Sequence, residues 1–69
     1  MITVAKNLNM KSARAKLDLS QEDLAVAVGV SRQTINSIEK GGGNPSLDLC
    51  KKISKTLNKS LDYLFGEEE

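Results

Sequence analysis

The chain has 69 residues, which provides one small domain and too little core for a deep catalytic cleft. It contains no histidine, one cysteine (Cys50) and only two aromatic residues, Tyr63 and Phe65. That composition excludes imidazole chemistry, ordinary zinc sites and an internal disulfide, and it disfavours folds that stack bases on aromatic side chains. The expectation is a small binding module of the reducing cytoplasm and not an enzyme, with no cofactor, metal, small-molecule ligand or membrane span.

The net charge of +1 hides an uneven distribution of charged residues. Three of the nine acidic residues form the run 67–69, which is typical of a solvated tail. Residues 1–66 therefore carry ten basic and six acidic side chains, a net charge of +4. This basic body suits a polyanionic partner, but lysines on solvated helix faces explain the same excess.

Turn residues and apolar spacing divide the chain into three parts. Residues 1–7 form an N-terminal arm, which is either a fraying segment or a short edge strand from Met1 to Ala5. Residues 8–66 form the folded domain, and residues 67–69 form the acidic tail. Within the domain the apolar residues recur at helical spacing, which predicts an all-α fold of five short helices.

The first helix is predicted from Leu8 to Leu17. Met10, Ala13 and Leu17 fall at the spacing of one helix face, which we expect to be the buried one. Asp18 follows where helices often end in a left-handed residue, a conformation that Asp tolerates better than most other residues.

A second helix is predicted to begin after Ser20 and to end at Gly29. The Ser20 hydroxyl and the Asp23 carboxylate match a capping box with a shorter acid, which pairs free backbone amides at the helix start. Gly29 ends the helix because glycine adopts the left-handed conformation without steric cost. The buried stripe of this helix is expected to be Leu24, Ala25 and Val28.

A third helix is predicted from Arg32 to about Lys40, with Ser31 as its N-cap. Ile35 and Ile38 lie three positions apart on its inner face, and Val30 stands where a hydrophobic staple would contact Ile35 or its neighbours.

The glycines at 41–43 end that helix, and the chain continues into a fourth predicted helix over residues 47–57. Ser60 is expected to cap a final short helix that closes at Gly66. The inward residues of the fourth helix are predicted to be Leu47, Cys50, Ile53 and Leu57. Cys50 is interpreted as a small buried hydrophobe.

Residues 21–40 meet the requirements of two helices that cross steeply at a tight turn. The crossing needs a small residue, the turn needs a residue with backbone freedom, and apolar side chains must seal the angle. Seven positions fill these roles: Leu24, Ala25, Val28, Gly29, Val30, Ile35 and Ile38.

The chain resembles the phage-repressor and Cro-like (XRE-type) helix-turn-helix family in four segments, Ser20–Ala25, Gly29–Ile35, Ile38–Gly41 and Asn44–Ser46. The likeness covers nearly the whole chain and is greatest to members that consist of the DNA-binding domain alone. It implies a five-helix, lambda-repressor-like domain that binds double-stranded DNA as a transcriptional regulator, most simply a repressor. It further implies that the third helix enters the major groove and that a homodimer binds a palindromic operator.

The residue types of the third helix suit base recognition independently of the family. With its two isoleucines inward, the outward face passes through Gln33, Asn36, Ser37 and Lys40, and Arg32 flanks it. Arg pairs with guanine, Gln or Asn pairs with adenine, and Ser pairs with either. The predicted base-reading residues are therefore Arg32, Gln33, Asn36 and Ser37, and the alternative is a plain solvated helix face.

The start of the second helix directs free backbone amides outward, where a phosphate would meet them. The resemblance puts a backbone-contacting glutamine at this position, Gln21, for which an ordinary exposed residue is the alternative. The loop after the third helix has glycines where many relatives place longer side chains, so we expect this loop to contribute less to phosphate binding. The predicted phosphate-contacting set is Gln21, Ser31, Thr34, Lys40 and Asn44.

Two further expectations concern the scaffold. The resemblance implies an ion pair between Arg14 of the first helix and Glu39 late in the third, which would hold the reading helix in place. Because one reading helix covers only a few base pairs, pairing of two copies is physically expected. The predicted dimer patch consists of Leu61, Leu64 and Phe65, joined by Ile2 and Val4 of the arm.

Two other functions stay open at this point. One alternative is an antitoxin-type protein, in which the same domain neutralises a toxin protein and represses its own operon. A protein-interaction module that has lost DNA binding is the other alternative, against which the polar pair Arg32 and Gln33 argues.

Overall fold

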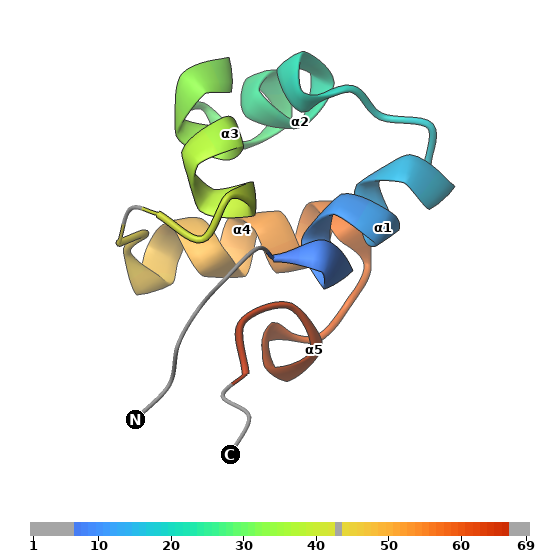
Figure 1. The fold of residues 1–69 in the computed structure, drawn as a ribbon. Coiled ribbons are helices and arrows are strands. Elements are labelled where there is room, and N and C mark those ends of the chain that lie inside the picture. Colours follow the sequence, from blue (N-terminus) through green and yellow to red (C-terminus); the bar gives the residue numbers. More distant parts are fainter. Residues whose placement is uncertain (1–6, 43, 67–69) are drawn as a thin grey trace.

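The computed structural model describes residues 7–42 and 44–66, and this part of the chain contains five α-helices and no β-strand (Figure 1). In chain order the helices are α1 (Leu8–Lys16), α2 (Gln21–Val28), α3 (Arg32–Glu39), α4 (Leu47–Leu57) and α5 (Leu61–Phe65). The predicted all-α architecture is confirmed. The predicted strand or arm at residues 1–6, including Ile2 and Val4, and the acidic tail lie outside the described residues.

Each helix is preceded by a polar N-cap residue whose side-chain oxygen accepts a hydrogen bond from the backbone N–H three residues later. The capping box predicted for α2 is confirmed, because Ser20 Oγ accepts from the Asp23 N–H at 2.9 Å and the Ser20 N–H donates to Asp23 Oδ2 at 3.0 Å. The backbone N–H of Ser20, with its hydroxyl, holds the pKa of Asp23 below its ordinary value. The five N-caps are Asn7, Ser20, Ser31, Ser46 and Ser60.

Left-handed residues follow the first four helices. Asp18 and Gly29 have φ angles of 59° and 78°, as the sequence predicts, and Gly41 has a φ of 89° after α3. Asn58 plays the same part at the end of α4 with a φ of 57°, which was not anticipated. These residues let the chain reverse within a few positions, so short helices pack against one another.

One hydrophobic core joins all five helices. α2 packs against α3 and α4, while α1 contacts α3, α4 and α5, so the α2–α3 pair rests on the rest of the bundle (Figure 1). The buried residues of this core are Met10, Ala13, Leu24, Ala25, Val28, Ile35, Ile38, Ile53, Leu57 and Leu64, and Cys50 is buried as well. None of the helices in residues 7–42 and 44–66 has the length and apolar character needed to cross a membrane.

Two predicted core residues are wrong. Leu17 is 46% exposed, because α1 ends at Lys16 and the left-handed Asp18 redirects the chain, so that Leu19 packs against the core instead. Leu47 is 64% exposed at the first position of α4. Leu49 takes its place, because the inner face marked by Ile53 and Leu57 continues through the residue four positions before Ile53.

Candidate nucleic-acid interface

The turn between α2 and α3 has the construction that the sequence predicts. The backbone N–H groups of Gly29 and Val30 both donate to the carbonyl of Ala25, at 2.8 and 3.0 Å, and this pattern satisfies the end of α2. Val30 is half-buried and packs against the core, next to the N-cap of α3. The two helices are therefore held as one rigid corner.

The outer face of α3 carries the four residues predicted to read bases. Arg32, Gln33 and Ser37 are exposed, whereas Asn36 is half-buried. Ile35 and Ile38 of the same helix are buried in the core, as predicted, so the orientation of this face is fixed by packing. Three side chains project freely from a fixed helix, and the fourth lies at its inner edge.

Two hydroxyl residues organise the first turn of α3. Ser31 Oγ accepts from the Thr34 N–H at 3.2 Å, and the hydroxyls of Ser31 and Thr34 lie 3.0 Å apart. Ser31 is exposed and Thr34 is half-buried. The cap leaves the amides at the first positions of α3 at the positive end of the helix dipole, where anions are favoured.

The loop after α3 begins with a fixed turn. Lys40 is the exposed C-cap of α3, and the Gly42 N–H donates to the Ser37 carbonyl at 2.9 Å. Asn44 is exposed further along the loop. Lys40 and Asn44 are thus accessible on the segment that follows α3.

Arg14 and Glu39 are brought together as an ion pair between α1 and the end of α3. Arg14 Nε and Nη2 donate to the two carboxylate oxygens of Glu39 at 2.8 and 3.2 Å, and Nη1 donates to the Leu19 carbonyl at 2.7 Å. The side chains are only 13% and 5% exposed. A fork of this kind fixes the direction as well as the distance between two helices.

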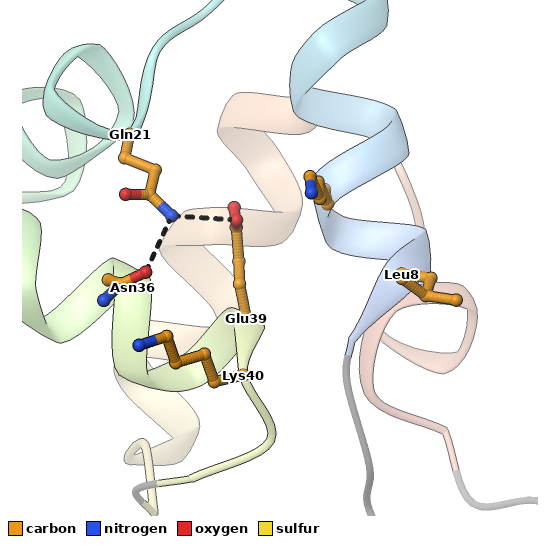
Figure 2. Close-up of a pocket in the computed structure, with 6 residues that line it drawn as sticks. Leu8, Gln21, Asn36, Glu39 and Lys40 are labelled. Atoms are coloured by element: carbon orange, nitrogen blue, oxygen red, sulfur yellow. Dashed lines mark hydrogen bonds between the residues drawn. The ribbon is translucent and has the colours of Figure 1, made fainter.

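Gln21 has its side-chain nitrogen turned inward, toward the end of α3 (Figure 2). Nε2 donates to Glu39 Oε1 at 3.1 Å and to Asn36 Oδ1 at 3.3 Å. The primary amide has two protons, and both have acceptors here. Arg14, Glu39, Gln21 and Asn36 therefore form one hydrogen-bonded network, the α1–α2–α3 network, which sequence reasoning missed apart from its Arg14–Glu39 pair.

A pocket of about 280 Å³ opens beside this network. Gln21 and Glu39 lie on one side of it, and Leu8 of α1 lies across from them (Figure 2). Lys11 and Lys40 line it as well and contribute positive charge from two elements. Lys11 was absent from the predicted contact set, and the only sequence signal for it was a basic residue on the outer face of the first helix.

The predicted dimer patch on α5 is smaller than expected. Leu64 is 3% exposed and belongs to the monomer core, so its side chain is not available on the surface. Leu61 and Phe65 are half-buried. Asn7 Nδ2 and Asn9 Nδ2 donate to the carbonyls of Leu64 and Tyr63, at 2.8 and 2.9 Å, and so tie α5 to the start of α1.

Comparison with known proteins gives the same fold and a family. The profile of the helix-turn-helix family HTH_3 matches residues 10–64. An uncharacterized HTH-type transcriptional regulator of Archaeoglobus fulgidus is 47% identical over 62 residues, and the match covers 87% of this chain and 87% of its own. The uncharacterized HTH-type regulator YgzD of Bacillus subtilis is 45% identical over 60 residues, covering 87% of this chain and 91% of its own.

A solved structure agrees with these relatives. The restriction-modification controller protein C.AhdI from Aeromonas hydrophila superposes with a TM-score of 0.78 at 30% identity, over 86% of this chain and 89% of its own. The region that the family profile matches, residues 10–64, includes the α2–α3 corner, α4 and most of α1 and α5. The chain belongs to the XRE-type helix-turn-helix family of transcriptional regulators.

Proposed function

We propose that the protein binds double-stranded DNA in a sequence-specific manner, with α3 in the major groove, and regulates transcription as a homodimer on a palindromic operator. The observation that carries the proposal is the exposure of Arg32, Gln33 and Ser37 on a helix whose opposite face is locked into the core. A helix of this kind docks as a rigid body and pays little conformational entropy for it. Repression by occlusion of a promoter is the simplest outcome of such binding.

Base recognition is assigned to the first two turns of α3. Arg32 offers a planar fork to the N7 and O6 acceptors of guanine, and Gln33 offers a donor and an acceptor to adenine. Ser37 lies one turn after Gln33 and donates to or accepts from a neighbouring base. Asn36 is the fourth residue of the set, and its half-buried position restricts what it can present.

Phosphate contacts are assigned to the elements on either side of α3. Ser31, Thr34, Lys40 and Asn44 supply hydroxyl, ammonium and amide donors. Gln21 differs, because both protons of its Nε2 are directed to Glu39 and Asn36. A phosphate at the start of α2 would therefore be bound by backbone N–H groups at the positive helix end, and Lys11 and Lys40 would add charge from the adjoining pocket.

A homodimer is proposed through α5. Leu61 and Phe65 are the half-buried apolar residues that remain after Leu64 is assigned to the core, and Tyr63 adds an exposed ring beside them. Two copies related by a two-fold axis would present two α3 helices to half-sites about one helical turn, ~34 Å, apart. A regulator of this kind acts in the compartment that holds the DNA.

The test is selection of bound duplexes from a random pool, followed by sedimentation with the enriched duplex. We expect a palindromic consensus, two chains per duplex, and an affinity that falls steeply as salt is raised. Enrichment of no sequence would overturn the proposal and favour a protein partner, such as a toxin. One chain per duplex would overturn the homodimer alone.

A further inference from the structure

The side-chain amide of Asn36 has a fixed orientation, and the cause lies at Glu39. The Glu39 carboxylate is held by the Arg14 fork and offers only acceptor oxygens. Gln21 lies beside it, so the Gln21 amide must turn its nitrogen, not its oxygen, toward Glu39 Oε1, which it meets at 3.1 Å. The reverse orientation would place two acceptor oxygens together in a half-buried site.

The second proton of the same Gln21 nitrogen determines the orientation of the Asn36 side-chain amide. It is donated to Asn36 Oδ1 at 3.3 Å, so that oxygen faces α2 (Figure 2). Within the described part of the chain Asn36 Nδ2 donates to no acceptor, while every buried side-chain nitrogen and oxygen there has a hydrogen-bond partner. Asn36 Nδ2 is therefore open to solvent, on the side away from Gln21 (Figure 2).

We propose that Asn36 meets DNA as a donor only, and that Glu39, acting through Gln21, positions it in that orientation. The inference rests on the proposed DNA binding. Asparagine pairs with adenine through two bonds, in which its oxygen accepts from N6 and its nitrogen donates to N7. Because Oδ1 faces α2, where it accepts from Gln21, and Nδ2 points away, Asn36 does not present both atoms to one adenine edge and offers its Nδ2 donors alone.

The partner of Asn36 is therefore an acceptor group of the duplex. In the major groove guanine presents two acceptors, O6 and N7, and is the best match, adenine N7 and thymine O4 offer one acceptor each, and the amino group of cytosine is a donor and is rejected. A phosphate oxygen offers the same acceptor chemistry. Guanine reading changes the base preference at one position, and phosphate contact changes the affinity for all duplexes alike.

The first experiment compares wild type, Asn36→Ala and Asn36→Asp on the selected operator and its single-base variants. Asp has nearly the shape of Asn, still accepts from Gln21, and presents an acceptor outward in place of a donor. If Asn36 reads a base, Asn36→Asp should reverse the preference at one base pair from guanine to cytosine by about tenfold, whereas Asn36→Ala should only flatten it. If Asn36 binds a phosphate, Asn36→Asp should weaken all duplexes by a similar factor, more strongly at low salt, and more than Asn36→Ala does.

The second experiment tests the positioning role of Gln21. Gln21→Met keeps the length of the side chain and removes both hydrogen bonds, so the Asn36 amide is free to turn. For a base-reading Asn36, adenine should rise about tenfold against guanine at the Asn36 position, because the two-bond pairing becomes available. Arg14 still donates to both Glu39 oxygens in this variant, so thermal unfolding is expected to stay close to wild type and serves as the folding control.

The inference is overturned by a wild-type protein that requires adenine at the Asn36 position and loses affinity when 2-aminopurine replaces that adenine. This analogue keeps N7 and lacks the N6 amino group, so such a loss would show that Asn36 accepts a hydrogen bond from the base. A base-reading Asn36 whose preference is unchanged in Gln21→Met would overturn the positioning role. A wild-type protein that selects no duplex at all would overturn the proposed function, and this inference with it.

Discussion

The Arg14 guanidinium donates to both carboxylate oxygens of Glu39, at 2.8 and 3.2 Å, and so joins α1 to the last residue of α3. The third side of the guanidinium is bound to the Leu19 carbonyl at 2.7 Å, in the segment that leads into α2. One side chain thus sets the position of both helices of the corner. Because the pair is largely screened from water, its partners depend on each other more than exposed charges do.

Replacement of Arg14 by Met is expected to destabilise the protein strongly. It leaves the buried Glu39 carboxylate with Gln21 as its one remaining side-chain donor among the described residues, and loss of one partner of a buried pair costs ~3–5 kcal/mol. For a chain of this size, that corresponds to a fall in Tm of roughly 10 °C or more, measured by circular dichroism.

The matched control is Lys52→Met, which breaks the exposed Lys52–Asp48 pair at 3.4 Å and should cost only ~0–1 kcal/mol. The double variant Arg14→Met/Glu39→Met should recover most of the loss, because no buried charge remains without its partner. Equal effects of Arg14→Met and Lys52→Met would contradict a structural role for the pair.

Substitution of Gly29 by Ala tests the cost of the left-handed backbone conformation separately from any steric clash of the added Cβ. A Cβ at Gly29 would meet no atom within 4 Å, but the φ of 78° is unfavourable for any residue with a Cβ. We expect a loss of about 1–2 kcal/mol in the free energy of unfolding, measured with urea.

Gly42→Ala provides the comparison. A Cβ there would make an ordinary contact with the Ser37 carbonyl at 3.6 Å, and Gly42 does not have a left-handed φ. Its substitution should be neutral or stabilising by up to about 1 kcal/mol, because alanine lowers the conformational entropy of the unfolded chain. A cost at Gly42 equal to that at Gly29 would show that loss of glycine, and not the left-handed φ, sets the effect.

Most of the fold could be predicted from local sequence rules, namely the spacing of N-caps and the periodicity of apolar residues. A serine N-cap and its hydrogen-bond partner lie three residues apart, so Ser20, Ser31 and Ser60 were recognised directly from the sequence. Helical periodicity likewise found Ile35 and Ile38. It failed at helix ends, where Leu17 and Leu47 continue the pattern by spacing but no longer point toward the core.

Only those features of the candidate site that lie within the single helix α3 could be predicted from the sequence. The outward direction of α3 follows from its buried residues, which identified Arg32 and Gln33 as exposed. The bonds of Gln21 to Asn36 and Glu39 span 15 and 18 residues and depend on how α2 and α3 cross. The spacing of residues in the sequence does not determine the angle between α2 and α3. The orientation of the Gln21 and Asn36 side-chain amides could therefore be found only from the structure.

The capping box of α2 predicts a pH dependence of stability. The pKa of Asp23 is lowered by the Ser20 backbone N–H and hydroxyl, so the charged carboxylate is favoured in the folded state. Its contribution is complete above the ordinary value of 3.8 and is lost as the pH falls through the lower folded-state pKa. Asp23→Asn removes the titrating group and keeps its shape.

The measurement is the difference in Tm between wild type and Asp23→Asn from pH 7 to pH 2. We expect wild type to be more stable at neutral pH and the two curves to converge below pH 3.8. Other carboxyl groups titrate in both proteins and cancel in the difference. A gap that stays constant over this range would mean that the charge of Asp23 does not contribute to the cap.

Base reading and charge attraction respond differently to substitutions on α3 and at its C-cap. Gln33→Ala should lower discrimination at one or two base pairs by ~1–3 kcal/mol, because an exposed residue of α3 is replaced on a fixed helix. Lys40→Ala should instead weaken all duplexes alike and reduce the slope of log affinity against log salt by about one. Lys55→Ala, on the exposed side of α4 and outside the proposed contact set, carries the same charge change and should have little effect on either quantity. Fluorescence anisotropy with the selected operator and single-base variants, at several salt concentrations, measures both. If Lys55→Ala and Lys40→Ala lowered the affinity equally, the basic body would act through net charge and not through a contact at the end of α3.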